Sequence, residues 1–256
     1  MNHLLSIEKL SRGEMEEILV AAAIMKRERG RHKAQPLAGQ TWALIFSKSS
    51  TRTRVSFEVG VSELGGRPMF LSANDIQMGR GEPVKDTARV MGRMIHGGVF
   101  RTFAQRDVEE FAHYAKIPTI NALTDEEHPC QILADIFTIE EKRGPMAGKV
   151  VTFVGDGACN VANSWIWTAG KLGFELRRRR PGERLGDKTG PVLVRDLPGF
   201  AVLQDLHDRL PGGVLHVHGV LRRDHPGQTV FAGQVEVDAI GDKVKDPPLE
   251  GTEKSH

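Results

Sequence analysis

A run of hydroxyl and arginine side chains, Ser49-Ser-Thr-Arg-Thr-Arg54, lies between two segments of different periodicity. The preceding segment, 41–46, is apolar like a buried strand, and 55–64 has the apolar spacing of a helix. A helix N-terminus carries unpaired N–H donors and partial positive charge, so these side chains predict an anion site suited to phosphate. A helix cap with solvated arginines is the simpler alternative. Two arginines beside several hydroxyls favour the phosphate site.

A second polar cluster, His128-Pro-Cys-Gln131, opens another predicted helix. A neutral imidazole can donate to a carbonyl oxygen, and the Gln131 amide can both accept and donate. A His-Pro pair at a helix start is by itself more often structural, and Arg101 alone would fit a surface ion pair equally well. Ligands of open α/β sheets gather at the carboxyl ends of strands. Ser50, Arg101 and His128 follow three such ends, which predicts one shared site.

The elements that would position these clusters alternate between strand and helix, which predicts an α/β fold with parallel sheets. Apolar runs predict strands at 41–46, 68–71, 99–101, 119–123, 149–154 and from 173. Helices are expected at 7–29, 55–64, 84–94, 108–114, from 128 onward and at 160–172.

The composition is that of a globular protein, with 256 residues, 39% hydrophobic and 27% charged. A net charge of +2 does not indicate nucleic-acid binding. No apolar run is long enough for a membrane span or a signal peptide. Cys130 and Cys159 are too few for a disulfide framework or a cysteine-based metal site. We therefore expect a cytoplasmic protein with neither nucleic acid nor membrane as a partner.

Together the two clusters resemble the carbamoyl-phosphate half of the aspartate/ornithine carbamoyltransferase family. The specific motifs are Ser-Thr-Arg-Thr-Arg at 50–54 and His-Pro-Cys-Gln-Ile-Leu-Ala-Asp at 128–135, and the match covers roughly 4–176. Ile76-Gln-Met-Gly-Arg-Gly-Glu82 and Leu133-Ala-Asp135 favour the ornithine branch over the aspartate branch.

The resemblance implies two parallel-sheet domains of the transcarbamoylase type, the second incomplete or aberrant. Residues 1–143 would form the carbamoyl-phosphate-binding domain. Residues 144–256 would form a partial ornithine-binding, Rossmann-like domain with an atypical tail from about 177. Residues 154–164, Val-Gly-Asp-Gly-Ala-Cys-Asn-Val-Ala-Asn-Ser, are similar to the start of that second domain.

The resemblance also implies site roles. The residues expected to hold the phosphate of carbamoyl phosphate are Ser50, Thr51, Arg52 and Thr53. Arg101 and His128 would polarise the carbonyl oxygen, and Gln131 would bind the amide, which makes these three the catalytic group. Asn160 would contact the amino-acid substrate. Gln77 would reach into a neighbouring subunit's site, which implies a homotrimer.

The implied reaction joins the δ-amine of L-ornithine to the carbamoyl carbon and gives L-citrulline and phosphate. This is a step of arginine metabolism, in arginine biosynthesis, the urea cycle or the arginine deiminase pathway. Carbamoyl phosphate is already activated, so positioning and electrostatic stabilisation are sufficient. We expect neither a metal nor a cofactor.

The character of the chain changes at Arg177. From there on, 18 of 80 residues are Gly or Pro, against 23 of 176 before, so the tail does not continue the strand and helix pattern. The family's Ser-Met-Gly and His-Cys-Leu-Pro motifs, which hold ornithine, do not occur after Leu176. A change of reading frame or a recombined tail is our hypothesis, which sequencing the gene and translating its other frames would test.

The tail contains two further patterns. His216-Val-His218, with His207 and His225 nearby, could form a metal site, but no spacing fixes a third ligand. The arginines at 177–180 could attract phosphate, although a solvated basic run is the simpler interpretation.

Two other functions compete with the transferase. A catalytically impaired carbamoyl-phosphate-binding module would keep the first domain and lack the ornithine loops. A nucleotide-dependent dehydrogenase would use the turn Gly155-Asp-Gly157, but this turn lacks the third glycine of the dinucleotide fingerprint. A titration with NAD would test the dehydrogenase.

Overall fold

A computed structural model describes residues 3–72, 76, 81–179 and 228–232. The strands are β1 (His3–Leu4), β2 (Thr41–Phe46), β3 (Arg67–Ser72), β4 (Gly97–Arg101), β5 (Thr119–Leu123), β6 (Val150–Val154), β7 (Glu175–Arg179) and β8 (Gln228–Ala232). The helices are α1 (Arg12–Glu28), α2 (Thr51–Glu63), α3 (Val84–Met91), α4 (Gln105–Ala115), α5 (Pro129–Arg143) and α6 (Asn160–Leu172).

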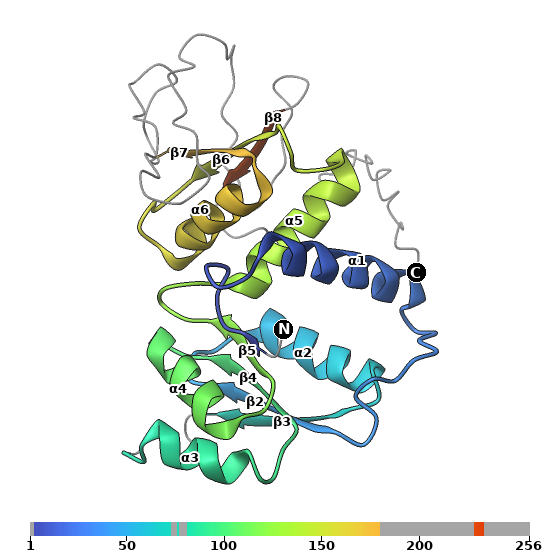
Figure 1. Cartoon of the computed structure of the whole chain (residues 1–256), viewed down its shortest axis with the longest axis vertical. Helices are drawn as coiled ribbons and strands as arrows, with labels where there is room; N and C mark the ends of the chain where they lie inside the picture. The colour runs from blue at the N-terminus through green and yellow to red at the C-terminus, as the bar shows by residue number, and fades with distance from the viewer. Residues whose placement is uncertain (1–2, 73–75, 77–80, 180–227, 233–256) are drawn as a thin grey trace, which may run out of the picture.

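These strands form two parallel sheets, and Figure 1 shows them at opposite ends of the described molecule. The first sheet has five strands in the order β1-β5-β4-β2-β3, and the second has the order β7-β6-β8. Every described strand pair is parallel. The expectation of an α/β fold with two parallel sheets is therefore confirmed.

The first sheet is covered by helices on both faces, and β2 contacts both layers because its side chains alternate in direction. On β2, Ala43 and Ile45 pack in a cluster with residues of α3 and α4. Trp42, Leu44 and Phe46 pack in a different cluster, which includes Val61 and Phe57 of α2. An unbroken apolar run, such as Trp42–Phe46 in β2, is expected when both faces of a strand are buried.

A third apolar cluster connects the helices between the two sheets with the second sheet. It contains apolar side chains of α1, α5, β6 and α6 together with Ile7 and Leu10 of the N-terminal segment. Trp165 of α6 is among its most buried members, at 1% exposure. In Figure 1, α1 and α5 lie between the first sheet and the second.

Capping residues set the starts of two helices differently from the sequence expectation. Helix α1 starts at Arg12 rather than at residue 7, because Ser11 caps it and forms a reciprocal capping box with Glu14. Helix α2 starts at Thr51, four residues before the expected apolar stretch, because Ser50 caps it. The arginines and threonines of the phosphate motif therefore lie within the first turn of α2.

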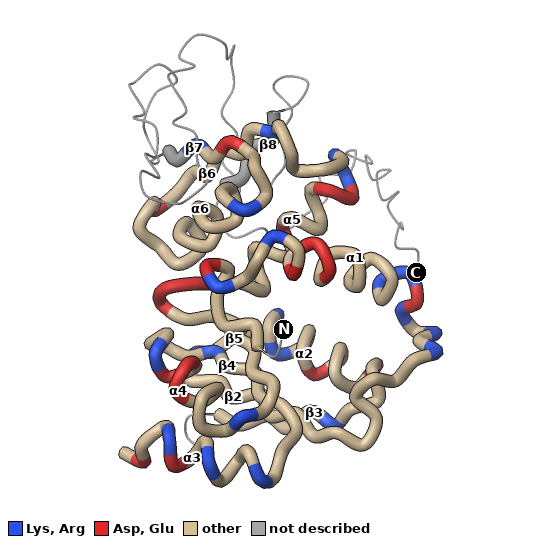
Figure 2. Tube along the Cα trace, in the orientation of Figure 1, with Lys and Arg blue, Asp and Glu red and all other residues tan. Residues whose placement is uncertain are grey.

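Charged residues of both signs are spread over the described trace in Figure 2. In the described part of the chain, no helix combines the length and apolar character needed to cross a membrane.

Candidate functional site

The candidate site lies at the carboxyl edge of the first sheet, where β5, β4 and β2 are neighbours. The loop after β2 is tied to the end of β4, since the backbone N–H groups of Ser47 and Lys48 donate to the Arg101 carbonyl oxygen at 2.8 and 3.4 Å. Lys48 also forms an ion pair with Asp125, which lies beyond the end of β5. The three loops that carry the predicted site residues are thus held together.

The phosphate motif occupies the N-terminus of α2. The Ser50 hydroxyl accepts a hydrogen bond from the Thr53 backbone N–H at 3.3 Å. The Thr53 hydroxyl lies 3.5 Å from Nη1 of Arg101 on β4. Thr51 and Arg52 are exposed in the first turn. The helix end thus presents hydroxyls beside a guanidinium group from another strand.

The other arginine of the motif has a different environment. The Arg54 guanidinium lies 2.9 Å from the Glu58 carboxylate and 3.6 Å from the centre of the Phe70 ring. Glu58 belongs to α2 and Phe70 to β3, so Arg54 contacts these two elements and not the strand-end loops.

Arg101 is the most enclosed cation at this edge. Burial lowers its pKa from the ordinary value of an arginine, although arginine remains charged in proteins. Its Nε is buried and has no hydrogen-bond partner among the described residues. A buried donor without a partner is uncommon and indicates space for a ligand or a water molecule.

His128 lies beyond the end of the neighbouring strand β5, in the loop before α5, and is 5% exposed. It is the N-cap residue of α5 and makes no capping bond with its side chain. Burial, followed by the positive charge of Arg101, lowers the pKa of the imidazole to about 4. Nδ1 is buried and lacks a hydrogen-bond partner among the described residues. At neutral pH the ring is therefore uncharged and retains hydrogen-bonding capacity.

Gln131 lies one turn into α5, where its Nε2 donates to the Asp135 carboxyl group at 2.9 Å. Asp135 is 3% exposed. Burial raises its pKa to about 7, against the opposing effect of the Gln131 amide. Cys130, between His128 and Gln131, has a pKa raised by burial to about 12, so its thiol is not a nucleophile.

Asn160, the first residue of α6, is bonded within the protein. Its Nδ2 donates to the Thr124 carbonyl oxygen at 2.6 Å, and its Oδ1 accepts from the Val161 backbone N–H at 2.8 Å. This places Asn160 against the loop that leads to His128. Gln77 lies outside the described residues, as do the tail histidines and Arg180 of the basic run.

Two polar residues near His128 were not singled out in the sequence. Glu127 and Ser164 are both buried, at 4% and 0% exposure. The Glu127 carboxylate accepts from the backbone N–H groups of Ile7 and Glu8, and burial raises its pKa against these bonds. A glutamate beside a predicted site histidine was the available signal, but its partners are distant in sequence.

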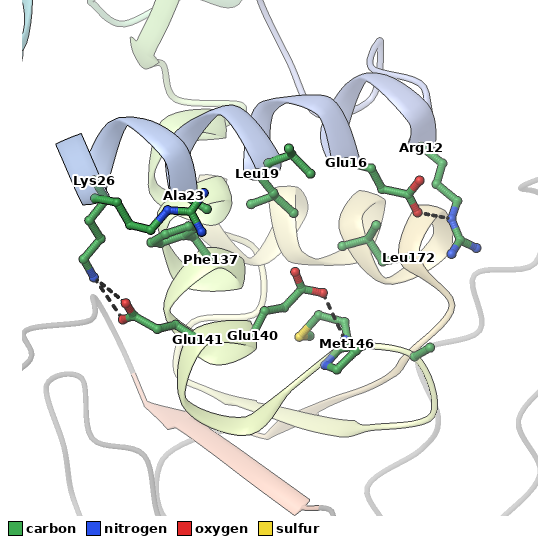
Figure 3. Close-up of a pocket in the computed structure, with 14 residues that line it drawn as sticks. Arg12, Glu16, Leu19, Ala23, Lys26, Phe137, Glu140, Glu141, Met146 and Leu172 are labelled. Atoms are coloured by element: carbon green, nitrogen blue, oxygen red, sulfur yellow. Dashed lines mark hydrogen bonds and ion pairs between the residues drawn. The ribbon is translucent and has the colours of Figure 1, made fainter. Parts of the chain in front are cut away.

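A cavity of about 730 Å³ lies away from this edge, between α1 and α5. Figure 3 shows Leu19, Phe137 and Leu172 in its lining, with the ion pairs Lys26–Glu141 and Arg12–Glu16 at its rim. None of the expected site residues lines this cavity. The cavity and the strand-end site are therefore separate features of the molecule.

The described residues contain no group of three or more His, Cys, Asp or Glu side chains that could hold a metal ion. The groups gathered at the strand ends are instead hydroxyls, a guanidinium, an imidazole and helix N–H donors. Such groups bind anions and polarise carbonyl oxygens.

Comparison with known proteins agrees with this chemistry. The family described as aspartate/ornithine carbamoyltransferase, carbamoyl-P binding domain, matches residues 2–141. This match covers more than half of the chain. The chain belongs to the aspartate/ornithine carbamoyltransferase family.

Relatives and solved structures point to one branch of this family. An ornithine carbamoyltransferase of Akkermansia muciniphila is 66% identical over 178 residues, which are 69% of this chain and 58% of that protein. One of Methanocorpusculum labreanum is 52% identical over 78% of this chain and 66% of its own length. The chain thus spans less than two thirds of the length of these two relatives.

Solved structures agree in fold. The ornithine carbamoyltransferase of Burkholderia thailandensis superposes with a TM-score of 0.67 at 46% identity, over 71% of this chain and 62% of that one. The enzyme of Pyrococcus furiosus gives 0.67 at 43% identity, over 70% and 57%.

Proposed function

We propose that this chain is an ornithine carbamoyltransferase that binds carbamoyl phosphate at the carboxyl edge of its first sheet. The observation that carries the proposal is the pair of buried polar atoms, Arg101 Nε and His128 Nδ1, that lack partners among the described residues on neighbouring strand ends. A ligand with a phosphate and a carbonyl group would satisfy both atoms and the hydroxyls at the start of α2. The names of the relatives support ornithine as the second substrate.

In this reaction the lone pair of ornithine's neutral δ-amine forms a bond to the carbamoyl carbon. The carbon–oxygen bond to phosphate breaks, phosphate leaves with the electron pair, and the amine loses a proton to it. Arg101 and the neutral His128 would stabilise the negative charge that develops on the carbonyl oxygen. Gln131 would bind the amide, while Ser50, Thr51, Arg52 and Thr53 would hold the phosphate.

The domain assignment follows from the same proposal. Residues 1–143 would be the carbamoyl-phosphate-binding domain, and 144–256 the partial ornithine-binding domain. Gly144, at φ 77°, ends α5 at this boundary. Asn160 would contact ornithine after exchanging its bond to Thr124, and Gln77 would serve a neighbouring subunit in a homotrimer.

A first experiment combines a citrulline-formation assay with calorimetry on carbamoyl phosphate alone. Turnover supports the transferase. Binding without turnover supports the alternative, a catalytically impaired carbamoyl-phosphate-binding module without the ornithine loops. Failure of the wild-type chain to bind carbamoyl phosphate would refute both.

Two arginine variants test where the phosphate binds. Loss of a charge-assisted contact in Arg52→Ala costs about 1.5–3 kcal/mol, so Kd should rise roughly tenfold to a hundredfold. Arg54→Ala is the matched control, because Arg54 contacts Glu58 and Phe70 instead. Equal losses in both variants would contradict the assignment of Arg52.

A further inference from the structure

The backbone loop that carries His128 is fastened to α6, a helix of the second sheet's unit. Three residues on one face of α6 bond to it, at spacings of three and four. Asn160 donates to the Thr124 carbonyl oxygen at 2.6 Å, and Asn163 donates to the Glu126 carbonyl oxygen at 3.2 Å. The Ser164 hydroxyl accepts from the His128 backbone N–H at 2.9 Å.

Ser164 has a second bond that sets the direction of its hydroxyl. Its Oγ lies 3.2 Å from Oε2 of Glu127, and a carboxylate can only accept. The single hydroxyl proton is therefore directed at Glu127, which leaves the oxygen's lone pairs for the His128 N–H. Ser164, Glu127 and His128 are all buried, so water does not compete for these hydrogen bonds as it would at the surface.

Glu127 is itself held from a third direction. Its Oε2 accepts from the Ile7 backbone N–H at 2.7 Å, and its Oε1 accepts from the Glu8 backbone N–H at 3.3 Å. The carboxylate thus joins the N-terminal segment, the His128 loop and α6. Lys171, at the end of α6, donates to the Glu8 carbonyl oxygen at 2.9 Å and reinforces the same connection.

The imidazole depends on this backbone anchoring, because its ring has few bonds of its own. His128 makes no side-chain capping bond, and its Nδ1 lacks a partner among the described residues. The bond to Ser164 restrains the backbone at the residue that carries the ring. Misplacement of a reacting group by about 1 Å can cost roughly a hundredfold in rate.

We propose that Ser164, oriented by the Glu127 carboxylate, is a positioning residue that fixes the His128 imidazole beside Arg101. The inference rests on the proposed transferase function and extends it to residues that touch no substrate. Because Ser164 and Asn160 share one face of α6, the element that would meet the amino-acid substrate is also the one that holds the histidine.

The test uses the full chain and the variant Ser164→Ala, with Thr168→Val as the matched control. Thr168 lies one turn further along α6, is equally buried, and donates its hydroxyl to the Ser164 carbonyl oxygen within the helix. Glu127→Gln is a second variant. The Glu127 carboxylate accepts hydrogen bonds on two oxygens, from Ile7, Glu8 and Ser164, whereas a glutamine amide has one acceptor oxygen. It covers the case in which Ser164→Ala does not fold.

The first readout is an NMR titration of the His128 imidazole, assigned with His128→Gln. In the wild type we expect a pKa near 4, set by burial and by the charge of Arg101. A ring freed by Ser164→Ala or Glu127→Gln gains water contact, so its pKa should rise toward the ordinary value by about one unit or more. Thr168→Val should leave it unchanged.

The second readout is the division between kcat and KM. We expect kcat to fall about tenfold or more in Ser164→Ala, and KM for carbamoyl phosphate to stay within about twofold. The Kd of inorganic phosphate, measured by calorimetry, should not change, since the phosphate loop is not altered.

A His128 pKa that is the same in Ser164→Ala, Glu127→Gln and Thr168→Val would overturn the positioning role. The titration needs neither substrate nor turnover. A wild-type chain that forms no citrulline would therefore refute the proposed function, while the titration would still decide whether Ser164 positions His128.

Discussion

Asp135 is a buried carboxyl group whose ionisation is linked to folding. Its pKa is raised from 3.8 to about 7 by burial, so the folded chain holds its proton more tightly than the unfolded chain does. The stability that this gives is fully present below about pH 3.8 and is lost as the pH rises through about 7.

His128 acts in the opposite direction. Its folded-state pKa of about 4 lies below the ordinary 6.5, so its contribution is present above about pH 6.5 and is lost as the pH falls through about 4. The two contributions partly cancel in the wild type. Only a comparison of variants separates them.

We predict that Asp135→Asn removes a pH-dependent loss of stability. Between about pH 5 and about pH 8, the wild type should lose roughly 3 kcal/mol relative to Asp135→Asn. The Asn side chain keeps an acceptor for Gln131, and urea unfolding at both pH values measures the difference. Asp156→Asn, at an exposed aspartate that accepts from the Ala158 N–H, is the control and should follow the wild type.

At the scale of single residues, the sequence predicts some members of the candidate site and not others. Ser50, Arg101 and His128 follow predicted strand ends, and the structure brings them to one edge of the sheet. Ser164 and Glu127 could not be found, because their hydrogen bonds join residues separated by more than thirty positions.

Gly92, directly after α3, packs against the backbone of Ala115 at the end of α4. Its φ of −61° suits any residue, so the requirement for glycine is one of space. A Cβ built there would lie 2.3 Å from the Ala115 carbonyl oxygen, which is backbone and cannot rotate away. The absence of a side chain therefore sets the packing distance of the pair.

We predict that Gly92→Ala destabilises the chain by about 1–3 kcal/mol, because α3 must shift away from α4. Gly60→Ala is the matched control. Gly60 lies inside α2 with no heavy atom within 4 Å of its built Cβ, so alanine should stabilise by roughly 0.5–1 kcal/mol. Chemical denaturation of both variants would test this, and equal effects would contradict it.

The presence of a helix or strand was easier to predict than the residues at which it begins and ends. Helix α6 runs from Asn160 to Leu172, as its apolar spacing predicts. The expected first helix included Ile7, but the structure places Ile7 in a turn before the helix. The apolar side chain of Ile7 is buried without being helical, and Ser11 caps α1 four residues later. Strands β1 and β8 were missed, since a two-residue strand and a strand in the atypical tail show no usable periodicity.

At the scale of the whole molecule, one apolar cluster joins helices α1 and α5 to the unit of the second sheet. Apolar residues of α1 and α5 pack with those of β6 and α6 in one cluster, and polar bonds from α6 to the His128 loop add to it. Domains joined through a large apolar core are expected to unfold together.

We predict a single unfolding transition, reported alike by tryptophans at both ends. Trp42 lies on β2, and Trp165 and Trp167 lie on α6. One variant, Trp165→Phe with Trp167→Phe, leaves the reporter in the first sheet; the other, Trp42→Phe, leaves those on α6. In each, the fluorescence midpoint should coincide with the midpoint from circular dichroism. Two separated midpoints would show that the sheets unfold independently.

The N-terminal segment has a consequence for biosynthesis. His3 and Leu4 pair with Thr119 and Ile120, and Ile7 and Glu8 bond to Glu127 and Lys171. On a ribosome, residues 3–8 are made before these partners, which follow by more than a hundred residues. At about 5–20 residues per second this delay is on the order of six to thirty seconds. Residues 3–8 can therefore form their native hydrogen bonds only well after they have been translated.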